Sequence, residues 1–329
     1  MKRAAAAALA AAVSVCPIAV DAYLKLGTEA SGTLTELRWS GFPVRYFITN
    51  RDIPGVSAPQ LQQAVGRALS SWSSLPDVPV SSQFVGFTQS APLSGDGMTV
   101  IGFQNRPDQD RVLGSTSFTV DAVSGKVIEA DIFLNSIFPW SVADGGESGR
   151  QDVESIALHE LGHLFGLGHS ALGETELIAG GRRVLGAESI MFPIAFSAGY
   201  VNRIPHADDI AGLSDLYGTD HFRSATGSIT GRVTKNGSGV LGAHIVAFNP
   251  TTGALVGGFT LAQDGAFTIG GLEPGLQIIR AEPLDDGDVA SFIDPLGVDV
   301  DFKPAIYGRL VAVPRGGSAP GIEVKVTSK

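Results

Sequence analysis

The chain has 329 residues, of which 44% are hydrophobic, and its formal net charge is −10 at pH 7. This composition is too apolar for a disordered protein, and the length is enough for two ordinary domains with separate cores. The sequence pI is near 5.0, and no cluster of Lys and Arg stands out. We therefore expect no nucleic-acid partner, because such a protein needs a basic surface.

Residues 1–22 have the form of a secretory signal peptide. A positive start precedes an apolar run from 4 to about 15, and Val20-Asp21-Ala22 offers small residues at a cleavage site. A buried alanine-rich helix or a membrane anchor is the alternative, although the run is short for crossing a bilayer. We expect a protein secreted to the outside of the cell or to the periplasm, with no transmembrane segment in the mature chain.

The only cysteine, Cys16, lies within this segment, so the mature chain would contain no disulfide. A short N-terminal segment, 23–37, would follow the signal. Beyond it, strand-like and helix-like stretches are mixed, which indicates an α/β or α+β domain. In chain order we expect a strand at Pro43–Asn50, a helix that begins after Ser57, a strand at Met98–Asn105, a strand pair at Leu113–Asp121 and Lys126–Asn135, a helix at Gln151–Phe165, a looser stretch, and a helix at about Pro205–Tyr217.

The character of the sequence changes near Ser224. Short β-type runs are broken by Gly, Pro and Asn, and turn signals recur every 8 to 12 residues without a helical period. This pattern is typical of a small β-sandwich. We predict a linker at 219–224 and a separate all-β domain at 225–329.

The stretch "LHELGHLFGLGHS", Leu158–Ser170, holds three of the six histidines. His159 and His163 are four residues apart, so on a helix they lie on one face and can share a metal ion. Glu160 lies about 100° round the helix, where it can take a proton from a metal-bound water without ligating the metal.

Gly166 stands where this helix must end, because glycine tolerates the left-handed conformation that turns the chain. His169 can then return as a third ligand. Three histidines leave a fourth tetrahedral position open for water, as in catalytic zinc sites. Imidazole also suits copper, iron or nickel, so the ligand type favours zinc without proving it. The plainer alternative is that each histidine is an ordinary surface or core residue. H-E-x-x-H alone can arise by chance, but the complete H-E-x-x-H-x-x-G-x-x-H pattern is far less prone to do so.

This stretch resembles the zinc signature of the metzincin metalloendopeptidases and, with Ser170 after the third histidine, most resembles the matrixins. "ESIMFP", Glu188–Pro193, is similar to the Met-turn of that family, and "HADDIAGLSDLYG", His206–Gly218, is similar to its C-terminal helix. The resemblance covers about 38–218. It implies an α+β fold, with a twisted mixed sheet and three helices.

The resemblance also implies a division of labour. His159, His163 and His169 would bind one catalytic Zn²⁺, Glu160 would be the general base, Met191 would support the site, and Pro193 would line the pocket for the residue after the cut bond. The edge strand, about Leu113–Val120, would pair with an extended peptide, although an ordinary internal strand is the plainer interpretation.

The sequence departs from the animal matrixins in two respects. The remaining histidines, His206, His221 and His244, are widely spaced, so we do not expect a structural zinc. No cysteine is available for the propeptide latency device of the family. A calcium ion at Asp285–Asp288 is possible in principle, but the alternating ligands of a calcium loop are missing, and a solvated turn is the simpler interpretation.

The C-terminal part of the chain, about 225–329, resembles the carboxypeptidase regulatory-like (transthyretin-like) β-sandwich. The resemblance rests on "GSITGRV", "GAHIVAFNPTTG", "DGAFTIGGLEPG" and "GIEVKV". This part of the chain has no catalytic residue that we can assign. The leading hypothesis is therefore a secreted zinc endopeptidase that acts on protein or peptide substrates. A non-catalytic adhesion or scaffold protein with a zinc clip, and an amidase or esterase with a non-protein substrate, are the alternatives. The sequence does not determine the oligomeric state.

Overall fold

The computed structural model describes residues 16–18, 24–30, 33–92, 95–179 and 181–329. Most of the predicted signal peptide, including its cleavage site, lies outside the described residues. Its described part is β1 (Cys16–Ile18), which pairs antiparallel with β2 (Lys25–Ala30) of the expected N-terminal segment. β2 in turn pairs with β3 (Thr33–Glu36). The described part of the expected N-terminal segment is therefore a small sheet that leads into the first domain.

A five-stranded sheet forms the frame of the first domain. Its strand order is β5 (Ser82–Thr88), β4 (Val44–Thr49), β6 (Thr99–Gln104), β8 (Val127–Asn135) and β7 (Gly114–Val120). The first four strands are parallel to their neighbours, and β7 is antiparallel to β8. This confirms the expected mixed sheet and places β7 at its edge.

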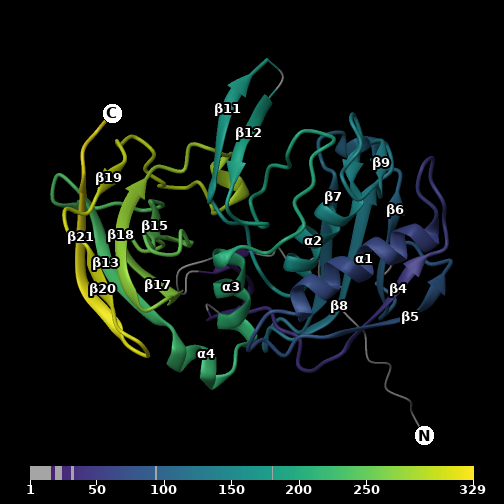
Figure 1. Ribbon diagram of the computed structural model, residues 1–329, viewed down its shortest axis with the longest axis horizontal. Helices are drawn as coiled ribbons and strands as arrows, with labels where there is room; N and C mark the ends of the chain where they lie inside the picture. Colours follow the sequence, from purple (N-terminus) through teal and green to yellow (C-terminus); the bar gives the residue numbers. More distant parts are fainter. Residues whose placement is uncertain (1–15, 19–23, 31–32, 93–94, 180) are drawn as a thin grey trace, which may run out of the picture.

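Two helices pack against each other on one face of this sheet (Figure 1): α1 (Ala58–Ser73) and α2 (Val153–Leu164). Ser57 caps α1 by accepting the amide of Gln60, as expected for a serine before a helical run. The indole Nε1 of Trp72 donates to the carbonyl of Leu158 at 3.0 Å and so ties the helices together inside the core. The short elements η1 (Pro107–Gln109), β9 (Trp140–Ser141) and β10 (Gln151–Asp152) complete this part of the chain before α2.

The chain after α2 contains elements that the sequence did not predict. The expected loose stretch contains a hairpin of β11 (Gly173–Ile178) and β12 (Gly181–Ala187), which extends away from the rest of the molecule (Figure 1). The last helix of the domain, α3 (Ala207–Tyr217), is where we expected it. The predicted linker at 219–224 lies mostly in a further helix, α4 (Asp220–Ala225).

The C-terminal region is rich in β-structure, as expected. One sheet contains β14 (Ser238–Gly239), β13 (Gly227–Lys235), β17 (Ala266–Leu272) and β21 (Ser318–Val326). The other contains β16 (Leu255–Phe259), β15 (His244–Phe248), β18 (Gly275–Glu282), β19 (Ala305–Ile306) and β20 (Val311–Val313). Side chains of both sheets, such as Ile229 and Ile245, join one hydrophobic core.

A third hydrophobic cluster joins the two halves of the molecule, which meet on either side of α3 in Figure 1. The first half contributes Leu24, Ala171, Val184 and Phe192, and the C-terminal region contributes Phe259, Leu284, Phe292 and Ile293. A polar contact adds to it, because the Asp208 carboxylate accepts the amide of Gly257 at 2.8 Å. The halves therefore share a buried apolar interface, which tends to hold their relative position.

Within the described residues, no helix is both long enough and apolar enough to cross a membrane.

Candidate metal centre

A cleft of about 1340 Å³ runs along the edge strand β7. Its floor includes the exposed face of α2, and the chain after the Met-turn, from Phe192 to Asn202, forms another wall. The C-terminal region adds a wall of its own through Leu284–Ser291. All three histidines of the motif, together with Glu160, line this cleft.

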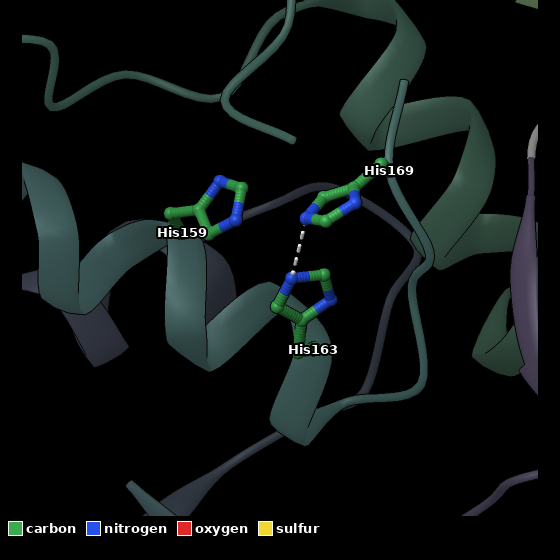
Figure 2. A group of neighbouring side chains, drawn as sticks. All are labelled: His159, His163 and His169. Atoms are coloured by element: carbon green, nitrogen blue, oxygen red, sulfur yellow. Dashed lines mark hydrogen bonds between the residues drawn. The ribbon is translucent and has the colours of Figure 1, made fainter. Parts of the chain in front are cut away.

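Helix α2 and the turn that follows it bring the three histidines together. Asp152 caps the helix by accepting the amide of Ser155 at 2.9 Å. Gly166 has a φ of +101°, and this left-handed conformation reverses the chain so that His169 returns to the helix. In Figure 2 the three rings point toward one another, His159 and His163 from α2 and His169 from the chain beyond it.

Each imidazole is held by a backbone carbonyl on its outer side. The Nδ1 atom of His159 lies 2.7 Å from the oxygen of Ile190, that of His163 lies 2.8 Å from Leu167, and that of His169 lies 2.6 Å from Ser291. A carbonyl can only accept a hydrogen bond, so each Nδ1 carries the proton. In a neutral ring this leaves the lone pair on Nε2, the atom that faces the centre.

The three inner nitrogens fit one small cation. All three ligand atoms lie within 4.8 Å of one another, and the Nε2 atoms of His163 and His169 are 3.1 Å apart. Tetrahedral zinc with bonds of about 2.0–2.1 Å needs ligand atoms roughly 3.3 Å apart. Two lone pairs at this distance repel each other unless a cation lies between them.

Burial keeps these rings neutral. It lowers the pKa of His159 to about 3, with a further contribution from the nearby His169 and partial opposition from the Ile190 carbonyl. Burial also lowers the pKa of His163 well below its usual value, and that of His169 in the same direction. Neutral imidazole is the form that binds metal, so the site is prepared for a cation at neutral pH.

Glu160 lies beside the three histidines, between α2 and the edge strand. Its side chain is only 4% exposed, and its Oε2 accepts a hydrogen bond of 2.8 Å from the hydroxyl of Thr116 on β7. Burial raises the pKa of this carboxyl to about 7, although the Thr116 hydroxyl opposes the shift. A carboxyl with a pKa near neutrality can both accept and return a proton.

Met191 and Pro193 both lie close to the helix or cleft that holds the histidines. Met191 is 2% exposed and packs beneath α2, so close that a Cβ at Gly162 would lie 2.3 Å from its sulfur. The glycine between the first two histidines is therefore needed for the Met-turn to approach the helix. Pro193 lines the cleft. Their supporting roles remain predictions.

Asp209 fixes the Met-turn from α3. One carboxylate oxygen accepts the hydroxyl of Ser189 at 2.6 Å and the amide of Met191 at 3.2 Å, and the other accepts the amide of Ile190 at 2.9 Å. In the sequence, Asp209 is part of the motif His206–Gly218, which resembles the C-terminal helix of the family. A carboxylate at a helix start is common, so the sequence carries no signal that this one also holds a loop.

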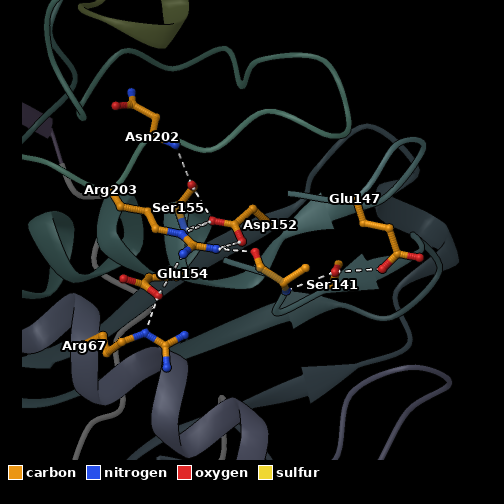
Figure 3. A network of polar contacts seen from close by, with 9 residues as sticks. Arg67, Ser141, Glu147, Asp152, Glu154, Ser155, Asn202 and Arg203 are labelled. Carbon is orange, nitrogen blue, oxygen red and sulfur yellow. Dashed lines mark hydrogen bonds and ion pairs between the residues drawn. The ribbon is translucent and has the colours of Figure 1, made fainter. Parts of the chain in front are cut away.

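A second polar network holds the wall that follows Pro193 (Figure 3). The guanidinium of Arg203 donates to both carboxylate oxygens of Asp152, at 2.9 and 2.6 Å, and the amide of Asn202 donates to the hydroxyl of Ser155 at 2.7 Å. Asp152 is the N-cap of α2, and Ser155 lies in the first turn of that helix. The wall of the cleft is thus attached to the N-terminus of the helix that carries His159.

The other three histidines are not part of the three-histidine cluster. His206 faces Glu188, His221 faces Asp77, and His244 is paired with Glu282 inside the C-terminal region. In the Asp285–Asp288 turn, Asp285 pairs with Lys329, and Asp286 accepts the amide of Thr175 at 2.8 Å. Asp285 and Asp286 therefore each have a protein partner, and the interpretation of this segment as a solvated turn stays a prediction.

Three histidines on an H-E-x-x-H helix and its following turn, below the edge of a mixed sheet, define the zinc metalloprotease class. A model of the matrixin family, peptidase M10, matches residues 38–218. The chain therefore belongs to the matrixin family, and its three-histidine zinc site is typical of that family.

Relatives of known name support this assignment. The chain is 27% identical to Metalloendoproteinase 5-MMP of Arabidopsis thaliana over 62% of its own length and 55% of that protein. It is 30% identical to Metalloendoproteinase 2-MMP of the same plant over 51% of its length and 40% of that protein. It is 26% identical to human Matrix metalloproteinase-16 over 56% of its length and 28% of that protein. The chain thus spans about half, or less, of the length of these relatives.

Proposed function

We propose that the protein is an exported zinc endopeptidase that hydrolyses peptide bonds. The observation that carries this proposal is the position of Glu160, buried beside three converging imidazoles and open to the cleft along β7. A zinc site that served only as a structural clip has no use for a carboxylate at this position. The names of the relatives, metalloendoproteinase and matrix metalloproteinase, support the same function.

The chain's own residues divide the work. His159, His163 and His169 would hold Zn²⁺, which supplies polarisation of the substrate carbonyl and a lowered pKa for water when it is bound. Glu160 would take a proton from the attacking water and return it to the leaving amine. Its pKa of about 7 and its hydrogen bond from Thr116 suit both transfers.

The cleft suits an extended peptide. β7 is an edge strand, with β8 on one side and the cleft on the other. A substrate can therefore pair with it by main-chain hydrogen bonds, as in other cases of strand addition. Pro193 would border the pocket for the side chain after the cut bond, and Met191 would support the zinc ligands from below.

Export and the domain division belong to the same proposal. We assign 1–22 to a signal peptide, 23–37 to a short N-terminal segment, 38–218 to the protease domain, 219–224 to a linker and 225–329 to a carboxypeptidase regulatory-like sandwich. The signal assignment rests on the sequence pattern alone. The sandwich assignment is supported by two sheets that share one core.

The test is a digest of a proteome-derived peptide mixture by the full chain and by Glu160→Gln, each with its zinc content measured. We expect about one zinc per wild-type chain, cleavage that a chelator abolishes, and a loss of at least about 100-fold in Glu160→Gln, since general acid–base catalysis contributes about 10²–10⁴-fold. The variant should keep its zinc. Undiminished cleavage by Glu160→Gln would contradict the proposal.

The adhesion or scaffold alternative makes a different prediction. It expects bound zinc without cleavage of any peptide in the mixture. An amidase or esterase would likewise leave the peptides intact but would hydrolyse small amides or esters, so the same samples separate all three hypotheses.

A further inference from the structure

One of the three zinc ligands is held from outside the part of the chain that matches the matrixin model. The carbonyls that face His159 and His163 belong to Ile190 and Leu167, both within 38–218. The carbonyl that faces His169 belongs to Ser291, which lies 122 residues further along the chain in the C-terminal region. At 2.6 Å this is the shortest of the three contacts.

Such a contact matters for metal affinity. The hydrogen bond from Nδ1 fixes the ring tautomer and its orientation, and loss of such an outer partner typically weakens metal binding by about 10–100-fold. His169 depends on it more than its neighbours do, since it stands on the chain after the helix and not on α2. The chain on either side of His169 is held by two backbone hydrogen bonds, from the amide of Gly168 to the carbonyl of Leu24 at 2.8 Å and from the amide of Ser170 to the carbonyl of Met191 at 2.9 Å.

The Ser291 carbonyl is itself well anchored. Ser291 is the last residue of the short 3-10 turn η2 (Val289–Ser291). The two residues that follow it, Phe292 and Ile293, are 3% and 7% exposed. Phe292 packs against Phe259, with ring centroids 6.3 Å apart, in the cluster that includes Phe192 of the first half. The amide and hydroxyl of Thr175 each bond to Asp286, both at 2.8 Å, and hold the preceding loop to the hairpin.

We propose that Ser291 is a positioning residue of the metal site and that the C-terminal region is an integral part of that site. Through η2 it sets the orientation of His169, and through Leu284–Ser291 it contributes one wall of the cleft. The protease part alone would therefore bind zinc less tightly than the whole chain. The inference rests on the zinc site of the proposed function but not on peptide cleavage.

The test compares zinc affinity in variants of the full chain by competition with a chromophoric chelator. Phe292→Ala removes the anchor of η2 from the shared cluster and should raise the zinc dissociation constant about 10-fold or more. Phe292→Leu keeps most of the anchor and should stay within about threefold of wild type. The matched control is Phe267→Ala, an equally buried phenylalanine in the core of the C-terminal sheets, which should change zinc affinity less than about twofold because it lies in a different cluster.

Zinc affinity in a folded Phe292→Ala equal to that of Phe267→Ala would overturn the proposal. If Phe292→Ala does not fold, a second experiment on the wild-type protein loaded with zinc tests the proposal. In a histidine-selective nuclear magnetic resonance experiment we expect a slowly exchanging Nδ1 proton for His169, identified by its loss in His169→Gln. Rapid exchange of this proton with solvent would rule out the carbonyl contact. Absence of peptide cleavage with unchanged zinc results would instead count against the proposed function only.

Discussion

The hydroxyl of Thr116 lies 2.8 Å from the Oε2 atom of Glu160 and joins the edge strand to the metal-binding helix. Burial alone would push the pKa of the Glu160 carboxyl upward, and this hydrogen bond holds part of that shift back. Thr116, which tunes the proposed base, therefore lies on the same strand, β7, that would pair with the substrate.

Replacing Thr116 by Val should shift the acidic limb of the kcat/KM profile to higher pH. The hydrogen bond stabilises the ionised carboxylate, so its loss raises the pKa of Glu160, and more acid is needed in wild type than in the variant to protonate the base. A charged hydrogen bond of about 1.5 kcal/mol corresponds to roughly one pH unit. Bound zinc lowers the pKa of Glu160 in wild type and in the variant alike, so the test is the difference in pH between the two acidic limbs. Thr119→Val, on an exposed position of the same strand, should leave the limb in place; equal limbs for Thr116→Val and wild type would contradict this role.

Replacing Lys25 by Met should destabilise the first half of the molecule. Lys25 is 1% exposed, and its ammonium group contacts both Glu36 and Asp215. Burial opposes its charge, but the two carboxylates outweigh burial and raise its pKa above the usual value. The variant would leave two partly buried carboxylates side by side, and we expect a loss of about 2–3 kcal/mol in the free energy of unfolding. Chemical denaturation measures it.

Lys325→Met is the matched control for that experiment. Lys325 is 76% exposed, and its ion pair with Glu323 lies on the surface of β21. Its loss should cost less than about 0.5 kcal/mol. Similar losses for the two lysines would show that the N-terminal segment is not an energetic part of the protease fold.

Replacing Asp208 by Asn should stabilise the protein at neutral pH but not in acid. Burial, and next the charge of Asp209, raise the pKa of Asp208 to about 6 from an ordinary value of 3.8. The folded chain then binds more protons than the unfolded chain between these values, so wild type loses stability as the pH rises from about 4 to 6. Asn cannot ionise and avoids this loss, which amounts to up to about 3 kcal/mol. Its side-chain oxygen can still accept the amide of Gly257.

Denaturation at pH 4.5 and pH 7.5 measures this difference. The stability gained by Asp208→Asn should be small at the lower pH and clear at the higher one. Asp294→Asn, at an exposed position of the C-terminal region, is the control. A gain of the same size at both pH values would mean that ionisation of Asp208 is not its cause.

Replacing Arg203 by Lys should weaken substrate binding more than catalysis. Lys cannot reproduce the two-pronged contact with Asp152, so the chain from Pro193 to Asn202 would be less firmly held along the cleft. We expect KM to rise several-fold, with kcat within about twofold and zinc content unchanged. Arg232→Lys, at an exposed pair with Asp264, is the control. A fall in kcat at constant KM would point instead to a disturbed zinc site.

The sequence alone was sufficient for the parts of this protein that follow local rules. Helical spacing puts His159 and His163 on one face, and a glycine that accepts a positive φ lets His169 return. The same rules predicted α1 after Ser57, the strand pair β7–β8 and the β-rich C-terminal region, because capping, turn signals and apolar periodicity all act within a few residues.

What only the tertiary structure decided is how distant segments meet. No local pattern shows that Ser291 faces His169, that Asp209 holds the Met-turn, or that Thr116 reaches Glu160. The hairpin β11–β12 and the cluster shared by the two halves were likewise not predicted. The hydrogen bonds of Ser291, Asp209 and Thr116 join residues 18 to 122 positions apart, and a short window of sequence carries no information on such pairs. They depend on how the sheets and helices pack, which is set by the burial of apolar surface over the whole chain.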